Sequence, residues 1–335
     1  MQTDRLYHTL EQAVKYQAGG TIVRINETWE DQSLVLFRAY GEQAGPTIWI
    51  QAAVHGDEHD GVIACMRLMS DLCLDKLHGS LVIFPIANAS ALLAGTNGSP
   101  IDGVNLNRVF TERIGTDKHI ANSYSYRYGR WLAEKIKTHA DVLIDLHGGG
   151  QWLEVCPFAM VASDDGAAYA TAIEALEPVP LTAIYSCSSS GKGMLINEIC
   201  RAGIPSILLE SGGGSSWGEG GVQTHLEGVR ILLDRFKSYP VAYSDFSASQ
   251  RHHKNRILSI SEVVELRFET DGLRTLRREA GEIVRKGDRL INVLTYPALA
   301  EESLRCPIEQ GVILSIHTAS SVRSGGYAVM LGKLT

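Results

Sequence analysis

The 335-residue chain lacks any Cys-x-x-Cys pair, any segment of membrane-spanning length and any apolar signal core near its first residue. Its six cysteines are scattered along the sequence, at positions 65, 73, 156, 187, 200 and 306. Such scatter is typical of reduced thiols rather than of a disulfide framework. We therefore expect a cytoplasmic protein that makes no use of a membrane.

The chain also lacks an excess of positive charge. It has 31 lysine and arginine residues against 38 acidic residues, which gives a formal net charge of −7. This balance provides no electrostatic reason to bind nucleic acid or an anionic membrane surface. A hydrophobic content of 44% and a charged content of 21% are ordinary for a soluble globular protein. The length allows two hydrophobic cores.

Short apolar runs alternate with helix-like segments from about residue 20 to residue 240. Strands are predicted at 21–25, 34–40, 47–54, 80–87, 141–146, 157–163, 181–185 and 206–210, and helices at 60–76, 126–138, 167–176, 193–202 and 221–238. The stretch 88–117 is rich in Asn, Gly and Ser, and we expect an irregular, functional loop there. The alternation predicts an α/β domain with a mixed or mostly parallel sheet flanked by helices.

The pattern changes after about residue 250. A basic stretch at 251–256 is followed by short β-like runs with glycine turns, for example 282–290 and 310–314. We expect the α/β domain at 1–250 and a smaller all-β, barrel-sandwich-like domain at 251–335, which shapes the mouth of a pocket. The turn around Lys286 is similar to biotinyl- and lipoyl-type barrels, but it lacks the sequence that flanks a modified lysine.

A His-Gly-Asp-Glu segment follows the apolar run 47–54. His55 and Glu58, three residues apart where a buried strand ends, form a plausible pair of metal ligands. The same segment fits H-x-x-E-H, in which His55 and His59 would both bind zinc and Glu58 would act as base. That alternative needs all five residues on one helix. A strand running into His55 and a turn at Gly56 favour the first interpretation.

A catalytic zinc site usually has a distant third protein ligand and a water molecule. His147 is the best candidate, because it ends the apolar run 141–146 and precedes three glycines. Asp145, two residues earlier, could orient a ligand imidazole from behind. A single histidine at a strand end is more often structural. Two such positions in one domain, one of them paired with a glutamate, favour the metal site.

Glu210 ends another apolar run, 204–209. A carboxylate in such surroundings is costly unless it has a partner or a chemical role. A general base that takes a proton from water and returns it to a leaving nitrogen would be such a role. The alternative is a glutamate that caps a helix or forms an ion pair. Asn107 and Arg108 lie in the irregular stretch, where an arginine beside an amide suits recognition of a substrate carboxylate, or is an ordinary surface pair.

Together, these motifs and their order resemble the succinylglutamate desuccinylase/aspartoacylase family, relatives of the zinc carboxypeptidases. The matching segments are 55–58, 105–110, 145–148 and 209–212. The C-terminal β region is also similar to that of the family. Within the family, the chain is most similar to the broad bacterial branch that includes N-acetyl-diaminobutyrate deacetylases.

This resemblance implies one zinc ion per chain on His55, Glu58 and His147, with Glu210 as general base. It also implies that Asn107 and Arg108 hold a carboxylate and that the reaction hydrolyses the amide bond of a small N-acyl amino acid. The sequence departs from the family at Asn97, where other members usually have an arginine. A doubly acidic substrate is therefore a weaker expectation.

Two other functions stay open on the sequence alone. Arg108 could hold the C-terminal carboxylate of a short peptide, which would make the protein a zinc carboxypeptidase. A metal-binding module without catalysis is the non-enzymatic alternative, although it would have no use for Glu210. The expected partner is a small molecule, and a homo-oligomer is also open.

Overall fold

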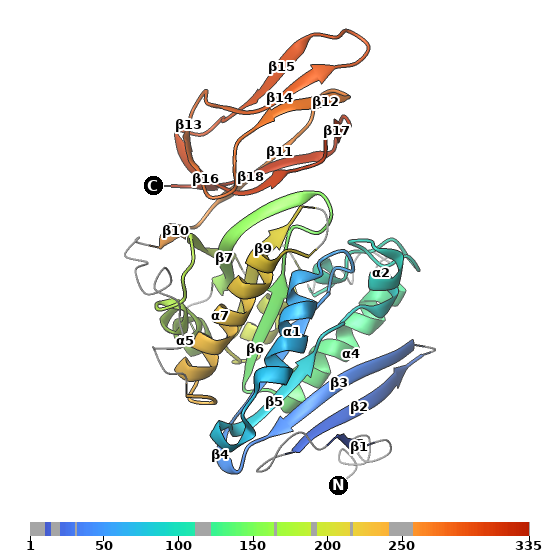
Figure 1. The fold of residues 1–335 in the computed structure, drawn as a ribbon, viewed down its shortest axis with the longest axis vertical. Helices are drawn as coiled ribbons and strands as arrows, with labels where there is room; N and C mark the ends of the chain where they lie inside the picture. Colours follow the sequence, from blue (N-terminus) through green and yellow to red (C-terminus); the bar gives the residue numbers. More distant parts are fainter. Residues whose placement is uncertain are drawn as a thin grey trace.

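A computed structural model of the protein describes residues 11–14, 21–30, 32–110, 122–163, 166–188, 193–214, 217–240 and 257–334. The predicted linker at 251–256, the domain boundary at 250 and the end of the predicted loop at 111–117 lie outside these residues. Figure 1 shows a layered α/β region below a region built of strands alone.

The centre of the main sheet consists of parallel strands. These are β4 (Gln43–Ala52), β5 (His78–Phe84), β6 (Val142–His147) and β9 (Ser206–Gly213), in the spatial order β5-β4-β6-β9. β6 is buried at every position, as the continuous apolar run predicts for a strand covered on both faces. The carboxyl ends of β4, β6 and β9 therefore meet at one edge of the sheet (Figure 1).

Antiparallel strands extend the sheet on both sides and make it mixed. At one edge lie β1 (Glu11–Val14), β2 (Thr21–Trp29) and β3 (Gln32–Tyr40). At the other side, β7 (Leu153–Ser163) pairs antiparallel with β9 and parallel with β8 (Ala183–Ser188). The prediction of a mixed sheet flanked by helices is confirmed.

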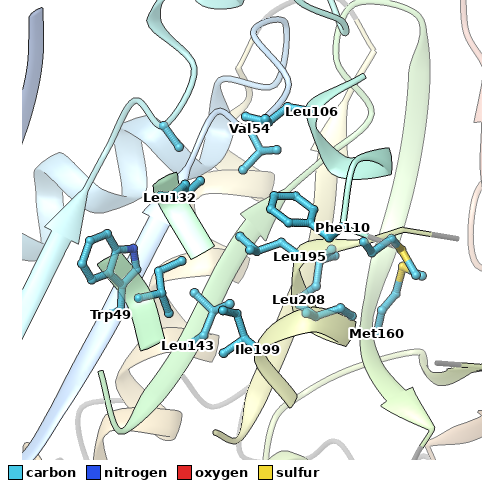
Figure 2. Close-up of a cluster of buried hydrophobic side chains, with 14 of the residues drawn as sticks. Trp49, Val54, Leu106, Phe110, Leu132, Leu143, Met160, Leu195, Ile199 and Leu208 are labelled. Atoms are coloured by element: carbon cyan, nitrogen blue, oxygen red, sulfur yellow. The ribbon is translucent and has the colours of Figure 1, made fainter. Parts of the chain in front are cut away.

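Helices cover the two faces of this sheet with different groups of side chains. One face packs against α4 (Tyr124–His139) and α6 (Leu195–Arg201), and Figure 2 shows Trp49, Leu143 and Leu208 of this cluster beside Leu132 and Leu195. The opposite face packs against α1 (Asp60–Asp71), α5 (Ala167–Leu176) and α7 (Glu219–Arg235). Because successive residues of a strand point to opposite faces, each central strand contributes to both clusters.

The C-terminal region is built of strands within its described residues. They are β10 (Leu258–Ile260), β11 (Val263–Arg267), β12 (Gly272–Arg277), β13 (Ile283–Arg285), β14 (Arg289–Thr295), β15 (Glu301–Arg305), β16 (Gln310–His317), β17 (Ser321–Val322) and β18 (Tyr327–Lys333). β16 pairs with β7, so the main sheet continues into β16, β18 and β11, while β15, β14, β12 and β17 form a second sheet. The all-β character is confirmed.

The stretch predicted to be irregular contains short helices. Asn88 caps α2 (Ala89–Ala94) through a bond from Ala91 N to its side chain, and Gly95 ends the helix at φ 63°. η3 (Leu106–Arg108) follows. These helices are too short to show a periodic apolar pattern, so they could not be predicted from the sequence. The predicted helix 60–76 instead ends at Asp71 and is followed by η2 (Leu74–Lys76). Among the described residues, none of the helices has the length and apolar character needed to cross a membrane.

Candidate metal and catalytic site

The carboxyl ends of three neighbouring strands bring the predicted site residues together. His147 is the last residue of β6 and is paired in register with Glu210 of β9, so both side chains lie on the face that packs against α4 and α6. His55 follows β4 on the other side of β6. A shared edge of parallel strands is where α/β proteins commonly bind ligands.

The turn after β4 holds His55 and Glu58 in place. Ala53 has a positive φ of 52°, a conformation that is uncommon for residues other than glycine. Gly56 packs so closely against Ala91 of α2 that any side chain there would collide. α1 begins only at Asp60, so His55 and His59 do not lie on one helix. His59 Nε2 instead lies 3.1 Å from the carbonyl of Gly56, and the H-x-x-E-H geometry does not form.

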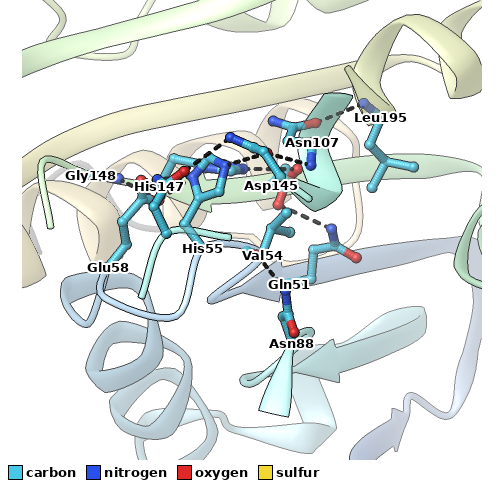
Figure 3. Close-up of polar contacts among 12 residues, drawn as sticks. Gln51, Val54, His55, Glu58, Asn88, Asn107, Asp145, His147, Gly148 and Leu195 are labelled. Atoms are coloured by element: carbon cyan, nitrogen blue, oxygen red, sulfur yellow. Dashed lines mark hydrogen bonds and ion pairs between the residues drawn. The ribbon is translucent and has the colours of Figure 1, made fainter. Parts of the chain in front are cut away.

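His55, Glu58 and His147 form a tight buried cluster (Figure 3). His55 Nδ1 lies 2.8 Å from Glu58 Oε1, and His147 Nδ1 lies 2.9 Å from Glu58 Oε2. The two Nδ1 atoms are 3.3 Å apart. One candidate ligand atom from each residue falls within 4.8 Å of the others. The backbone N–H of Gly148 donates to Glu58 Oε2 at 3.1 Å and fixes the carboxylate.

The outer nitrogen of His55 is held by an amide. The backbone N–H of Asn107 donates to Asn105 Oδ1 at 2.8 Å, and Asn105 Nδ2 donates to Asn97 Oδ1 at 3.0 Å. Asn105 Oδ1 is therefore an acceptor, so the His55 Nε2 that lies 3.0 Å from it carries the proton. His55 Nδ1 then presents a lone pair to the cluster.

The outer nitrogen of His147 faces a carboxylate. His147 Nε2 lies 3.2 Å from Asp145 Oδ2, and Gln51 Nε2 donates to Asp145 Oδ1 at 3.1 Å. Trp49 Nε1 in turn donates to Gln51 Oε1 at 3.0 Å. All four side chains are buried, and we refer to Trp49, Gln51 and Asp145 as the support chain of His147. A carboxylate behind an imidazole is a common arrangement at metal sites.

The chemistry of this cluster fits a divalent cation. His55 Nε2 lies at hydrogen-bond distance from Asn105 Oδ1, and His147 Nε2 faces the Asp145 carboxylate. The two Nδ1 atoms and the Glu58 carboxylate then converge, and a cation between these acceptors would balance them. Burial would raise the pKa of Glu58, but His55 and His147 hold it well below its usual value. Burial would lower the pKa of His147, but Asp145 and Glu58 raise it well above its ordinary value.

Glu210 lies at the side of this cluster in a different electrostatic setting. Burial and then the neighbouring charge of Glu58 raise its pKa to about 8.

Asn107 Oδ1 accepts a hydrogen bond from the backbone N–H of Leu195 at 2.9 Å, which attaches η3 to the start of α6. Arg108 is exposed and donates to the carbonyl of Asn107 at 2.8 Å. The positive charge of Arg108 acts on Glu210 and lowers its pKa in part.

A cavity of about 540 Å³ contains the cluster, Glu210, Asn107 and Arg108. This volume lies within the usual range for small-molecule sites. The strands β11, β16 and β18 of the C-terminal region contribute to its wall. Every predicted site residue except Asp145, which lies behind His147, lines this one cavity.

Sequence reasoning assigned no role to Asn105, Gln51 or Trp49. Asn105 stood beside the Asn-Arg pair, so its position was a usable signal for a second polar residue near His55. Gln51 interrupts an otherwise apolar strand, and a polar residue in such a run needs a buried partner. Asn97 is also placed by the structure: its Oδ1 accepts a hydrogen bond from the amide of Asn105.

Comparison with solved structures establishes the class of fold. A succinylglutamate desuccinylase/aspartoacylase from Rhodobacter sphaeroides superposes with a TM-score of 0.78 at 20% identity, over 98% of each chain. The product-bound ectoine utilization protein of Ruegeria pomeroyi gives a TM-score of 0.76 at 23% identity, over 97% of this chain and 99% of that one. The fold is therefore the one that these proteins share.

The sequence then identifies the family. The model of the succinylglutamate desuccinylase/aspartoacylase catalytic domain matches residues 44–236, and this chain belongs to that family. The N-alpha-acetyl-L-2,4-diaminobutyric acid deacetylase of Halomonas elongata is 31% identical over 174 residues, which are 51% of this chain and 49% of the deacetylase. The chain thus matches about half the length of that curated relative.

Proposed function

We propose that this protein hydrolyses the amide bond of a small N-acyl amino acid with the help of one zinc ion. The observation that carries this proposal is the convergence of His55 Nδ1, His147 Nδ1 and Glu58 on one point, with each imidazole fixed from behind. His55, Glu58 and His147 would hold the zinc ion. Membership of the desuccinylase/aspartoacylase family supports the type of reaction.

A zinc ion held by His55, Glu58 and His147 would polarise the scissile carbonyl and would lower the pKa of an attacking water from about 15.7 to roughly 7. Glu210 accepts the proton of that water on its carboxylate and delivers it to the amide nitrogen. The hydroxyl group stays on the acyl carbon while the C–N bond breaks, which gives an acid and a free amine.

Zinc in the site would counter the negative charge of Glu58, which is the second cause of the raised pKa of Glu210. The zinc-loaded protein would therefore have Glu210 ionised, and ready to accept a proton, at a lower pH than the metal-free protein. Asp145 keeps His147 oriented, and its own bond to Gln51 limits its movement.

Asn107 and Arg108 position the substrate in this proposal. Asn107 is buried and accepts a hydrogen bond from Leu195, so it fixes η3, while the exposed Arg108 lines the cavity and binds the carboxylate of the amino acid part. A guanidinium group binds a carboxylate through two parallel hydrogen bonds. The Halomonas relative is a deacetylase of an N-acetylated amino acid, which supports this substrate class.

The division into residues 1–250 and 251–335 and the cytoplasmic location are part of the same proposal. The described C-terminal strands supply cavity residues, which agrees with a second unit that limits access to the site. All six cysteines are free thiols, as expected for a reducing compartment.

The test is a hydrolysis screen of zinc-loaded protein against N-acyl amino acids and dipeptides, with free amine as the readout. Release of amine from N-acyl amino acids, together with about one zinc per chain, is the expected result. Faster cleavage of dipeptides would instead make the protein a carboxypeptidase. Bound zinc without any hydrolysis would leave a metal-binding module.

A further inference from the structure

The wall of the cavity beyond Glu210 is apolar. It is formed by Val155, Phe158 and Met160 of β7, Leu208 of β9, and Met194 just before α6. Their exposed fractions range from 0% to 8%, so these side chains are packed into the core and form a fixed wall. A substrate group that enters this part of the cavity meets hydrocarbon and thioether groups.

The strand register explains why this wall lies beside Glu210. Phe158 is paired with Glu210 and Met160 with Leu208 across the antiparallel β7–β9 ladder, so all four side chains share one face. Since His147 is paired with Glu210 on the other side, Glu210 separates the metal cluster from the apolar wall. Neighbouring strands lie about 4.8 Å apart, so the wall begins within one side-chain length of the reacting bond.

Positive charge is scarce in this cavity. Among the described lining residues, only Arg108 and Arg267 carry a permanent positive charge. Arg267 belongs to β11, is more than half exposed, and donates to the carbonyl of Gly325 at 3.0 Å. Besides Arg108, a second substrate carboxylate would therefore have only the largely exposed Arg267 as a permanent positive charge among the described lining residues.

Arg108 lies close to this wall as well. Asn107 Oδ1 accepts the N–H of Leu195 at 2.9 Å, and the N–H of Phe110 donates to the carbonyl of Gly193 at 3.0 Å. These two bonds place η3 next to Met194. A carboxylate on Arg108 therefore brings the side chain of the same amino acid toward Met194 and the β7 residues.

We propose that the amino acid released by this enzyme has an apolar side chain, aliphatic or thioether, that binds against Phe158, Met160 and Met194. This inference rests on the proposed function. It separates the protein from an enzyme that prefers an acidic amino acid, and from the Halomonas relative, whose substrate is a derivative of the basic diaminobutyric acid. A charged side chain in this position would lose its hydration without gaining a partner.

The first experiment measures kcat/KM of zinc-loaded protein for N-acetyl derivatives of glycine, alanine, norvaline and norleucine, and of aspartate and diaminobutyrate. Each methylene buried is expected to raise kcat/KM by about fourfold until the wall is filled. Highest activity on the aspartate or diaminobutyrate compound, or no rise along the aliphatic series, would overturn the proposal.

The second experiment changes the wall itself. Met160→Ala should shift the preference toward longer or branched side chains, because it enlarges the apolar space without touching the metal cluster. Met194→Ala serves the same purpose if the first variant does not fold. Met66→Ala is the matched control, since Met66 is an exposed residue of α1. A uniform loss on every substrate, with unchanged ranking, would show a merely structural role for the wall.

A binding measurement separates the two proposals. Calorimetry with the free amino acids norleucine and aspartate tests the apolar wall even if no N-acetyl compound is hydrolysed. Tighter binding of norleucine supports the apolar subsite. Tighter binding of aspartate would contradict it, while failure of hydrolysis alone would count against the proposed reaction.

Discussion

The two faces of the central sheet are made from the same strands but do different things. Toward α1, α5 and α7, the strand residues are apolar up to the carboxyl edge, as with Leu146 and Leu209. Toward α4 and α6, the neighbouring positions carry His147 and Glu210, with Gln51 and Asp145 beneath them. One face therefore stabilises the sheet by apolar packing, and the other carries the candidate site. A shift of one residue along a strand moves a side chain from one face to the other and so changes its role.

The largest expected effect comes from Glu210→Gln, on the site-bearing face. The variant should retain zinc and lose kcat by about 10² to 10⁴-fold, because the proposed proton acceptor is gone while the residues proposed to hold zinc are unchanged. Metal analysis and steady-state kinetics check this. Glu174→Gln, on an exposed position of α5, is the control. Near-normal turnover of the Glu210 variant would remove this residue from the mechanism.

On the opposite face, Leu209→Ala should lower the free energy of unfolding by about 2 to 5 kcal/mol, because the residue is buried among the α5 and α7 side chains. Activity per folded molecule should stay close to normal. Denaturant unfolding and zinc-loaded kinetics on the same sample provide the measurement. A large loss of activity per folded molecule would show that the roles of the two faces cannot be separated in this way.

The support chain of His147 allows a finer comparison. Asp145→Asn should weaken zinc binding by about 10 to 100-fold, because the carboxylate behind the imidazole is lost. Gln51→Leu should weaken it less, since Asp145 is still present but loses the bond from Gln51 Nε2. Competition with a chelator gives the affinities. An equal loss of zinc affinity in both variants would mean that Asp145 supports His147 only when Gln51 holds it in place.

His55 offers the matching test with a neutral partner. Asn105→Ala should reduce zinc affinity by less than Asp145→Asn, because an amide oxygen supports an imidazole less strongly than a carboxylate. Asn97→Ala should have a smaller effect again, as it only removes the bond that orients Asn105. A larger effect of Asn105→Ala than of Asp145→Asn would reverse this order of support.

The smallest effect concerns the helices that cover the site-bearing face. Glu198 of α6 contacts Lys137 of α4 at 2.6 Å and Arg201 at 2.7 Å. Burial raises the pKa of Glu198, but these two cations hold it below its usual value. The stabilisation is thus present above the unfolded pKa, near 4.5, and is lost as pH falls through the folded pKa. Glu198→Gln should cost about 1 kcal/mol at pH 7 and little in acid, measured by unfolding at both pH values.

Much of the fold could be predicted from periodicity alone. The continuous apolar runs of β4, β6 and β9 indicated covered strands, and the alternation with helices indicated an α/β sheet. The short helices α2 and η3 could not be predicted, because three to six residues show no period and depend on caps such as Asn88. The continuation of the main sheet into β16, β18 and β11 also left no sequence signal, since strand pairing between distant segments depends on tertiary packing.

The sequence by itself determined the chemical groups: two histidines, two glutamates and an Asn-Arg pair, placed at strand ends or in the following loop. Only the tertiary structure decided how they are oriented. The convergence of His55 Nδ1 and His147 Nδ1 depends on Asn105 and Asp145, which lie 50 and 2 residues away from their respective partners along the chain. The apolar wall beside Glu210 likewise exists because β7 pairs antiparallel with β9, and such a register is set by folding rather than by any local motif.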